Sequence, residues 1–154
     1  MKINNKDKNI VLIGFMGSGK TSVGKRLSLV LKREFIDTDD FIEKREGMTI
    51  NEIFKEKGEE EFRKIERELY KRFSTPKKKI IATGGGVIKN SANIANLKKG
   101  GVIVYLKSSP EKIAQNLKFD NTRPILQVDD KEAKIRELLA QREPFYNKYA
   151  EITI

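Results

Sequence analysis

The residues best suited to chemistry lie in one octet, residues 14–21, which reads Gly-Phe-Met-Gly-Ser-Gly-Lys-Thr. It follows the apolar run 10–13 and leads into a helical pattern, which is the context that a phosphate-binding Gly-x-x-x-x-Gly-Lys-Ser/Thr loop requires. The glycines let backbone N–H groups converge, while Lys20 and Thr21 supply an ammonium group and a magnesium-binding hydroxyl. A simple strand-to-helix turn does not need this combination. We therefore predict that the octet binds the polyphosphate of a nucleotide.

Two aspartates, Asp37 and Asp39, follow a short predicted strand. If the extended conformation continues, both carboxylates project to one side while Thr38 and Asp40 point away. Beside a magnesium-bound triphosphate, one carboxylate can lie near the metal through a water, and the other can accept the proton of an attacking hydroxyl. The alternative is that Asp39 or Asp40 only caps a helix that begins near Phe41.

Several later residues could recognise an anionic ligand. Arg63 lies beside the apolar stripe of a predicted helix, three residues before Glu66, so an ion pair within the helix is the alternative. The glycines at 84–86 follow a predicted strand and indicate close approach of a ligand or another segment. Arg123 lies in an irregular stretch, where it forms either a loop ion pair or a contact that neutralises a transferring phosphoryl group. Arg142 is ambiguous by itself.

Strands that alternate with helices must position these residues. Strands are predicted over residues 9–13, 35–36, 80–82, 102–106 and 152–154. A first helix is predicted from the octet to about 32, and its apolar face carries Val23, Leu27, Val30 and Leu31. Further helices are predicted from 41 to about 47, from 49 to an interruption at Gly58, and over 59–73. The last two begin at about 110 and 131, and Pro144 should kink or break the second of them. This alternation predicts a parallel sheet covered on both faces, with ligands at the carboxyl ends of the strands.

Composition limits the classes that remain. The 154 residues suit a single domain, and the chain contains no cysteine, no membrane-length apolar run and no secretory signal. We therefore expect a cytoplasmic monomer. The formal charge of +10 is mostly carried by lysines scattered along the chain. Without a basic patch interleaved with aromatic residues, this charge indicates solubility and a preference for small anions, and we expect no nucleic-acid or membrane partner.

Together, these features resemble the shikimate kinase family over essentially the whole chain. Besides the octet, the matching segments are Asp-Thr-Asp at 37–39, Glu-Phe-Arg-Lys-Ile-Glu at 61–66, the glycines at 84–86, Arg-Pro-Ile-Leu at 123–126, and Arg142 followed by Pro144 and Tyr146. The octet is shared by many nucleotide enzymes. The order and spacing of all the segments are far more specific.

The resemblance implies an α/β fold of the P-loop kinase type, with three αβα layers and a five-stranded parallel sheet of order 2-3-1-4-5. It implies transfer of the γ-phosphoryl of ATP to the 3-hydroxyl of shikimate, with Mg²⁺, in aromatic amino acid biosynthesis. One domain over 1–154 would contain an acid-binding region at about 37–73 and a lid at about 117–130.

The resemblance also implies residue roles. Asp39 would act as base, with Lys20 and Arg123 stabilising the transferred charge, while Thr21 and, through water, Asp37 would hold Mg²⁺. The residues implied for binding ATP are Gly14, Met16, Gly17, Ser18, Gly19, Lys20, Thr21, Ser22 and Arg123. The residues implied for binding shikimate are Asp39, Phe54, Phe62, Arg63, Gly84, Gly85, Gly86 and Arg142, with Glu66 orienting Arg63.

The chain departs from the family pattern at two places. Asn116 stands where the family often has an arginine that stacks on adenine, and Lys118 is the nearest cation. The family also normally continues beyond the position of Ile154 through an adenine-contacting loop and a final helix, a segment that we expect to be absent here. The nearest alternative function is another small-molecule P-loop kinase, such as a gluconate or nucleotide kinase. A regulatory nucleotide switch or a nucleic-acid-binding module is the alternative from a different class.

Overall fold

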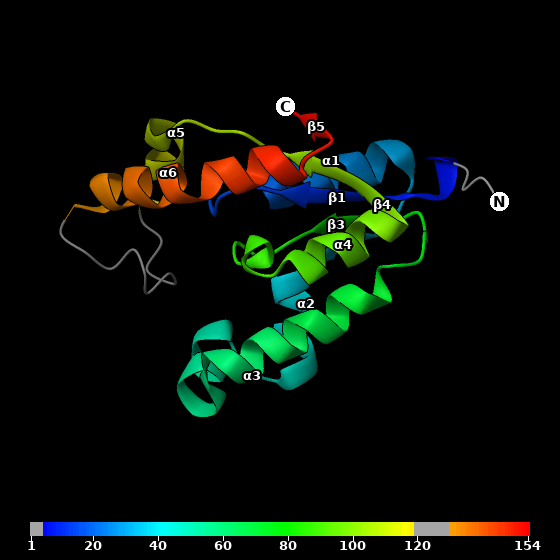
Figure 1. Ribbon diagram of the computed structural model, residues 1–154, viewed down its shortest axis with the longest axis horizontal. Helices are drawn as coiled ribbons and strands as arrows, with labels where there is room; N and C mark the ends of the chain where they lie inside the picture. Colours follow the sequence, from blue (N-terminus) through cyan, green and yellow to red (C-terminus); the bar gives the residue numbers. More distant parts are fainter. Residues whose placement is uncertain (1–4, 119–129) are drawn as a thin grey trace.

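The computed structural model describes residues 5–118 and 130–154, which form an α/β fold around one parallel sheet (Figure 1). The strand order is β2-β3-β1-β4-β5, and every neighbouring pair is parallel. This confirms the predicted sheet and its order. The strands are β1 (Asn9–Ile13), β2 (Phe35–Asp37), β3 (Ile80–Ala82), β4 (Gly101–Tyr105) and β5 (Ile152–Thr153).

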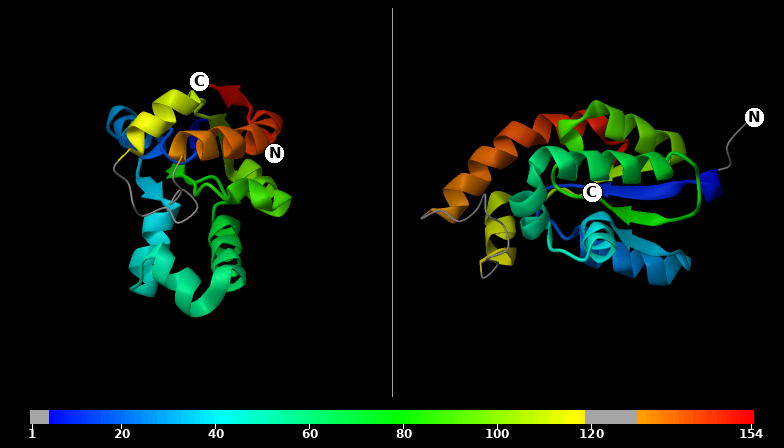
Figure 2. Two further views of the ribbon diagram at one scale, coloured as in Figure 1. Left: turned by 90° about the vertical axis from the view of Figure 1, so that its left-hand side faces the viewer. Right: turned by 90° about the horizontal axis from the view of Figure 1, so that it is seen from below.

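Helices cover both faces of the sheet. They are α1 (Lys20–Leu31), α2 (Thr38–Glu46), α3 (Ile50–Arg72), α4 (Ser91–Gly100), α5 (Pro110–Asn116) and α6 (Lys131–Tyr149), with short 3-10 turns η1 (Asn5–Asp7) and η2 (Val87–Lys89). Figure 2 shows α1 on one side of the strands and α4 and α6 on the other. Sequence reasoning missed α4, although Asn90 caps it by accepting a hydrogen bond from the N–H of Ala92 at 2.9 Å.

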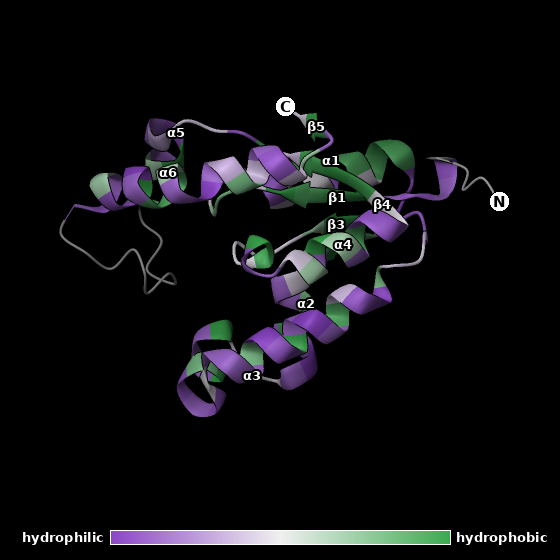
Figure 3. Cartoon of the chain, in the orientation of Figure 1, coloured by the Kyte–Doolittle hydropathy of each residue, from purple (hydrophilic) through white to green (hydrophobic). Residues whose placement is uncertain are grey.

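The core follows from the alternation of side chains along the strands. Val11 and Ile13 of β1 belong to the larger buried cluster, with side chains of α3, α4 and α6, whereas Leu12 belongs to a smaller one that Leu27 of α1 joins. The strands are accordingly hydrophobic on both faces, and the polar residues lie on the outer helix surfaces (Figure 3).

Two local expectations hold only in part. The apolar face predicted for α1 is only partly buried, because the helix meets the sheet through Gly24 and Leu27 and leaves Val30 69% exposed. A kink or a break was predicted at Pro144, and helix α6 continues through Pro144 to Tyr149, so a break does not occur. The carbonyl of Ala140, which proline cannot pair, lies on an exposed residue where water can satisfy it.

The interruption at Gly58 is confirmed. Thr49 begins α3 by accepting a hydrogen bond from the N–H of Glu52 at 3.1 Å. Gly58 then adopts φ 86° and ψ 162°, which separates two helical halves that point in different directions. Only glycine reaches this backbone region at low cost. The halves are therefore two helices joined at one residue, as the sequence predicted.

The start of β1 is fixed by one buried side chain that sequence reasoning did not single out. Asn9 Nδ2 donates to the carbonyls of Phe73 and Thr75 at 3.4 and 3.2 Å. Its Oδ1 accepts from the N–H groups of Lys77 and Lys79 at 3.0 and 2.9 Å. One amide thereby ties the strand that precedes the phosphate loop to the connection between α3 and β3.

We predict that Asn9→Ala lowers the free energy of unfolding by about 2–4 kcal/mol, because it removes the buried side chain that pairs four backbone groups, one of them buried and three partly buried. Urea denaturation followed by circular dichroism measures this change. The control is Asn147→Ala on the exposed surface of α6, which should change stability by less than about 0.5 kcal/mol. Equal stability of the two variants would contradict the role of Asn9.

Candidate functional site

The phosphate loop connects β1 to α1 through backbone conformations that favour glycine. Gly14, Gly17 and Gly19 have φ values of 155°, 80° and 96°. Lys20 lies in the first turn of α1, and its Nζ donates to the carbonyl oxygens of Gly14 and Phe15 at 2.6 and 3.1 Å. The ammonium group is thus held over the loop, at the positive end of the helix dipole. A polyphosphate would meet both at once.

Other predicted nucleotide-binding residues surround this point. Ser18 Oγ is buried and makes no hydrogen bond within the described residues. Met16 is buried, whereas Ser22 is exposed on α1. Asn116, at the end of α5, donates from Nδ2 to the carbonyl of Gly17 at 2.8 Å. Asn116, which stands where the resemblance implies an adenine-stacking arginine, therefore contacts the phosphate loop here.

Asp37 and Asp39 face different partners. The expectation that a continuing strand would direct both carboxylates to one side was wrong. Strand β2 ends at Asp37 and α2 begins at Thr38, so the extended conformation does not continue. The cap is Asp37, whose Oδ1 accepts from the N–H of Asp40 at 3.1 Å, and not Asp39 or Asp40. Asp37 Oδ2 also accepts from Thr21 Oγ1 at 3.0 Å, which places this carboxylate beside the phosphate loop.

The three glycines after β3 each lie against one chemically active side chain. A Cβ on Gly84 would lie 2.7 Å from Asp39 Oδ1, and one on Gly85 would lie 3.5 Å from Arg142 Nη1. A Cβ on Gly86 would overlap Arg63 Nη1. The structure therefore brings together Asp39, Arg63 and Arg142 from three different helices at one backbone segment. Close approach, and not only a turn, explains Gly84 and Gly86, whereas a Cβ on Gly85 would make only an ordinary van der Waals contact.

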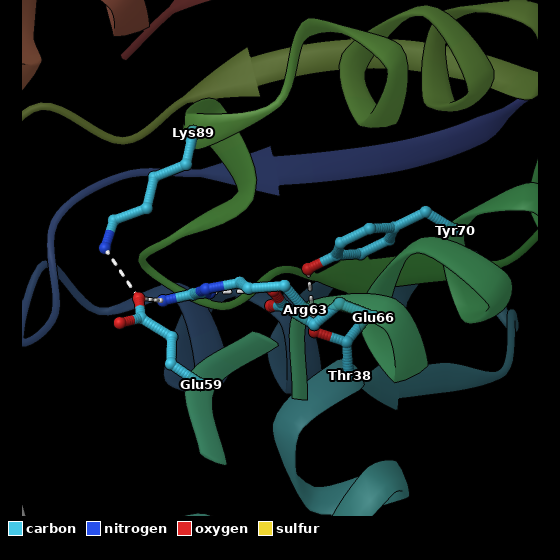
Figure 4. Close-up of polar contacts among 6 residues, drawn as sticks. All are labelled: Thr38, Glu59, Arg63, Glu66, Tyr70 and Lys89. Carbon is cyan, nitrogen blue, oxygen red and sulfur yellow. Dashed lines mark hydrogen bonds and ion pairs between the residues drawn. The ribbon is translucent and has the colours of Figure 1, made fainter. Parts of the chain in front are cut away.

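Arg63 is held by an ion pair with the buried Glu66 (Figure 4) and by two aromatic rings. Its Nη1 donates to Glu66 Oε1 at 2.7 Å, and the Glu66 side chain is only 2% exposed. The guanidinium carbon lies 5.9 Å from the ring centroid of Phe54 and 5.3 Å from that of Phe62. Glu66 thus has the orienting position expected of it, and the rings restrict the remaining freedom of the guanidinium group.

A polar layer lies behind this pair. Burial raises the pKa of Glu66, an effect that Arg63 partly offsets and Asp39 reinforces. Thr38 Oγ1 and the hydroxyl of Tyr70 lie 3.5 Å apart, and burial raises the pKa of Tyr70 well above its ordinary value, with Glu66 adding to it. The contact between Thr38 and Tyr70 was not predicted from the sequence, because it depends on the tertiary structure.

Arg142 projects from α6 toward the same segment. Its guanidinium carbon lies 5.3 Å from the ring centroid of Phe15 in the phosphate loop. Its Nη1 is buried and makes no hydrogen bond in the part of the chain that the structure describes. One turn further on, Tyr146 stacks on Tyr105 of β4 with ring centroids 4.9 Å apart, which fixes α6 against the sheet.

Thr21 and Asp37 are suitable ligands for Mg²⁺. Both offer oxygen atoms, and one or two protein oxygens completed by substrate phosphates are what Mg²⁺ takes in phosphoryl-transfer sites. Over residues 5–118 and 130–154, no group of three or more His, Cys, Asp or Glu could hold a metal ion without such help. The donor set therefore fits a cation shared with a nucleotide.

Some sequence predictions meet no test here, and some site residues were not predicted. Arg123 and most of the expected lid, about 117–130, lie outside the described residues. Glu59 and Lys89 were missed, although the four-residue spacing of Glu59 and Arg63 is a signal for an ion pair.

In the described part of the chain, no helix is long and apolar enough to span a bilayer.

Comparison with known proteins agrees with this arrangement. Residues 16–154 match the model of the shikimate kinase family. A shikimate kinase of Caldanaerobacter subterraneus subsp. tengcongensis is 52% identical over 147 residues, which are 96% of this chain and 85% of that protein. One of Thermodesulfovibrio yellowstonii is 51% identical over 141 residues, 92% of this chain and 82% of that protein.

Solved structures give the same result. The shikimate kinase from Acinetobacter baumannii in complex with shikimate has a TM-score of 0.89 and 43% identity, and the match covers 96% of this chain and 82% of that one. A gluconokinase from Sinorhizobium meliloti has a TM-score of 0.51 at 14% identity, a similarity that shows the fold alone. The chain therefore belongs to the shikimate kinase family, and it is an ATP-dependent kinase with a hydroxyl acceptor.

Proposed function

We propose that the residues around the three glycines hold shikimate by its carboxylate and hydroxyls while the phosphate loop holds ATP, so that the 3-hydroxyl receives the γ-phosphoryl group. The products are shikimate 3-phosphate and ADP. One observation carries the substrate assignment: Arg63 Nε and Arg142 Nη1 are both buried without a hydrogen bond in the described chain, and both guanidinium groups lie against neighbouring glycines. A carboxylate between them supplies the missing acceptors.

Each remaining residue has a role that follows from its position. Asp39, against Gly84, accepts the proton of the attacking hydroxyl. Lys20 moves from the loop carbonyls to the phosphates and stabilises the transferred charge. Arg123 keeps its predicted role in the same stabilisation. Phe54 and Phe62 pack against the carbon skeleton of the acid.

Thr21 and Asp37 would hold Mg²⁺, Asp37 through water, and the cation would neutralise phosphate charge and orient the phosphates when bound. Everything that the proposal needs comes from one chain. We therefore keep the expectation of a monomer. The cytoplasmic location and the absence of a nucleic-acid or membrane partner stay predictions from the composition.

The proposal is tested directly by shikimate-dependent release of ADP in a coupled assay with Mg·ATP. We expect turnover with shikimate and only background release with gluconate, which shares a carboxylate and hydroxyls but has no ring. Circular dichroism establishes that the protein is folded. Folded protein that leaves shikimate unchanged, or that prefers gluconate, would contradict the proposed function.

We predict that Asp39→Asn lowers kcat by about 10²- to 10⁴-fold, because the amide cannot accept the proton, while the KM for ATP changes little. Steady-state kinetics with each substrate varied separates these effects. The matched control is the neighbouring Asp40→Asn, which alters an exposed carboxylate paired with Lys44 and should leave kcat unchanged. Near-normal turnover of Asp39→Asn would remove Asp39 as the base.

Glu66 is a positioning residue, and its raised pKa predicts a pH dependence. Because the pKa lies above the ordinary glutamate value, Glu66 loses its charge at a higher pH than exposed glutamates, and Arg63 then loses its buried partner. Shikimate affinity should therefore decline on acidification through that raised pKa and remain constant above it.

We predict that Glu66→Gln abolishes this acid limb and weakens shikimate binding about tenfold at neutral pH, because a charged hydrogen bond is lost. Titration calorimetry without ATP measures both effects over a range of pH. Glu68→Gln, on the exposed face of α3, is the control. A limb that persists unchanged in Glu66→Gln would show that another group is responsible.

A further inference from the structure

Glu59 lies between two cations at the edge of the site. Its Oε1 is 3.4 Å from Arg63 Nη2 and 3.4 Å from Lys89 Nζ (Figure 4). Glu59 is the first residue after the backbone break at Gly58, and Lys89 ends the η2 turn three residues after Gly86. The contact therefore connects α3 with the segment that follows the three glycines, directly beside Arg63.

The donors of Arg63 are not equally occupied. Nη1 makes the short bond to the buried Glu66, whereas the longer contact with Glu59 is the only one that Nη2 makes among residues 5–118 and 130–154. Nε is buried and makes no hydrogen bond to any residue that the structure describes. In a guanidinium group, Nε–H and the N–H of Nη2 project along one edge, which takes a carboxylate through two parallel bonds. Glu59 already lies at Nη2, so a ligand carboxylate on that edge competes with Glu59 for the charge of the same nitrogen.

We propose that Glu59 is a displaceable counter-ion of Arg63. Glu59 lies at the carboxylate-binding edge of Arg63 until the acid substrate arrives, and Lys89 then retains the displaced Glu59. This inference rests on the proposed function, because it takes Arg63 as the group that binds the substrate carboxylate. Glu59 and Lys89 thereby set the affinity for the acid without contacting it.

The two ion pairs of Arg63 differ in their exposure to solvent, as displacement of Glu59 but not of Glu66 requires. Glu59 is 58% exposed and Lys89 is 50% exposed, whereas Glu66 is 2% exposed. Exposed pairs contribute little net stabilisation, so exchange of Glu59 for a ligand carboxylate costs little, while the pair with Glu66 persists. Lys89 is also the strongest influence that lowers the pKa of Glu59, which therefore stays ionised and has a partner after displacement.

Three variants separate this role from its alternatives. Glu59→Gln removes the competing charge, so the dissociation constant for shikimate should fall about twofold to fivefold. Lys89→Met leaves Glu59 with Arg63 alone, so the constant should rise by a similar factor. Because Lys89 acts only through Glu59, the double variant should bind like Glu59→Gln.

The measurement is titration of shikimate by calorimetry without ATP, followed by kinetics in which KM shifts and kcat does not. Shikimate methyl ester, which has no carboxylate, should bind Glu59→Gln no more tightly than it binds the original protein. The matched control is Glu132→Gln, which breaks an exposed pair of the same four-residue spacing with Arg136 on α6 and should leave shikimate binding unchanged. Thermal melting checks that each variant is folded.

Each contrary result has a distinct meaning. Weaker binding by Glu59→Gln would overturn the proposal and show that Glu59 orients Arg63. A double variant as weak as Lys89→Met would overturn it by showing that Lys89 contacts the substrate. Unchanged binding in all variants would reduce the cluster to a surface ion pair. Failure of the original protein to bind shikimate would instead refute the proposed function.

Discussion

The site depends on a backbone segment that leaves no room for a side chain at Gly84 or at Gly86. Asp39, Arg63 and Arg142 come from α2, α3 and α6, and each lies against a different glycine of the segment 84–86. One carboxylate and two cations therefore meet along three consecutive backbone residues. Any Cβ at Gly84 or Gly86 would push a functional group away, so the absence of side chains here is itself what assembles the site.

The buried carboxylate of Glu66 neutralises one of the two arginines of the site and leaves the other without a counter-charge of its own among the described residues. Glu66 balances Arg63, while Arg142 lies nearby over an aromatic ring and keeps a buried N–H without an acceptor. Burial makes the charge on Glu66 costly, and Arg63 is the group that offsets this cost. The pair therefore fixes the position of Arg63 firmly, and the remaining donors give the site a preference for an anion.

Sequence reasoning succeeded where the signal was local. The phosphate loop, the five strands, the Thr49 cap and the Gly58 interruption all follow from residue types at fixed spacing. It failed where tertiary contacts decide: Asp37 caps α2 because the strand ends there, and Val30 stays exposed because α1 meets the sheet through Gly24. The partners of the glycines, and the meeting of Glu59 with Lys89, depend on segments that the chain brings together only in the folded state.

The break at Gly58 shows how one residue shapes the acid-binding side. Phe54 and Phe62 are eight residues apart, so a continuous helix would separate them by about 12 Å along its axis. Their ring centroids are instead 4.9 Å apart, and both rings flank Arg63. The backbone at Gly58, with φ 86°, turns the first half of α3 back toward the second. This conformation is strained for any residue with a Cβ. A side chain at position 58 would therefore shift Phe54, Phe62 and Glu59 together, without contacting the ligand.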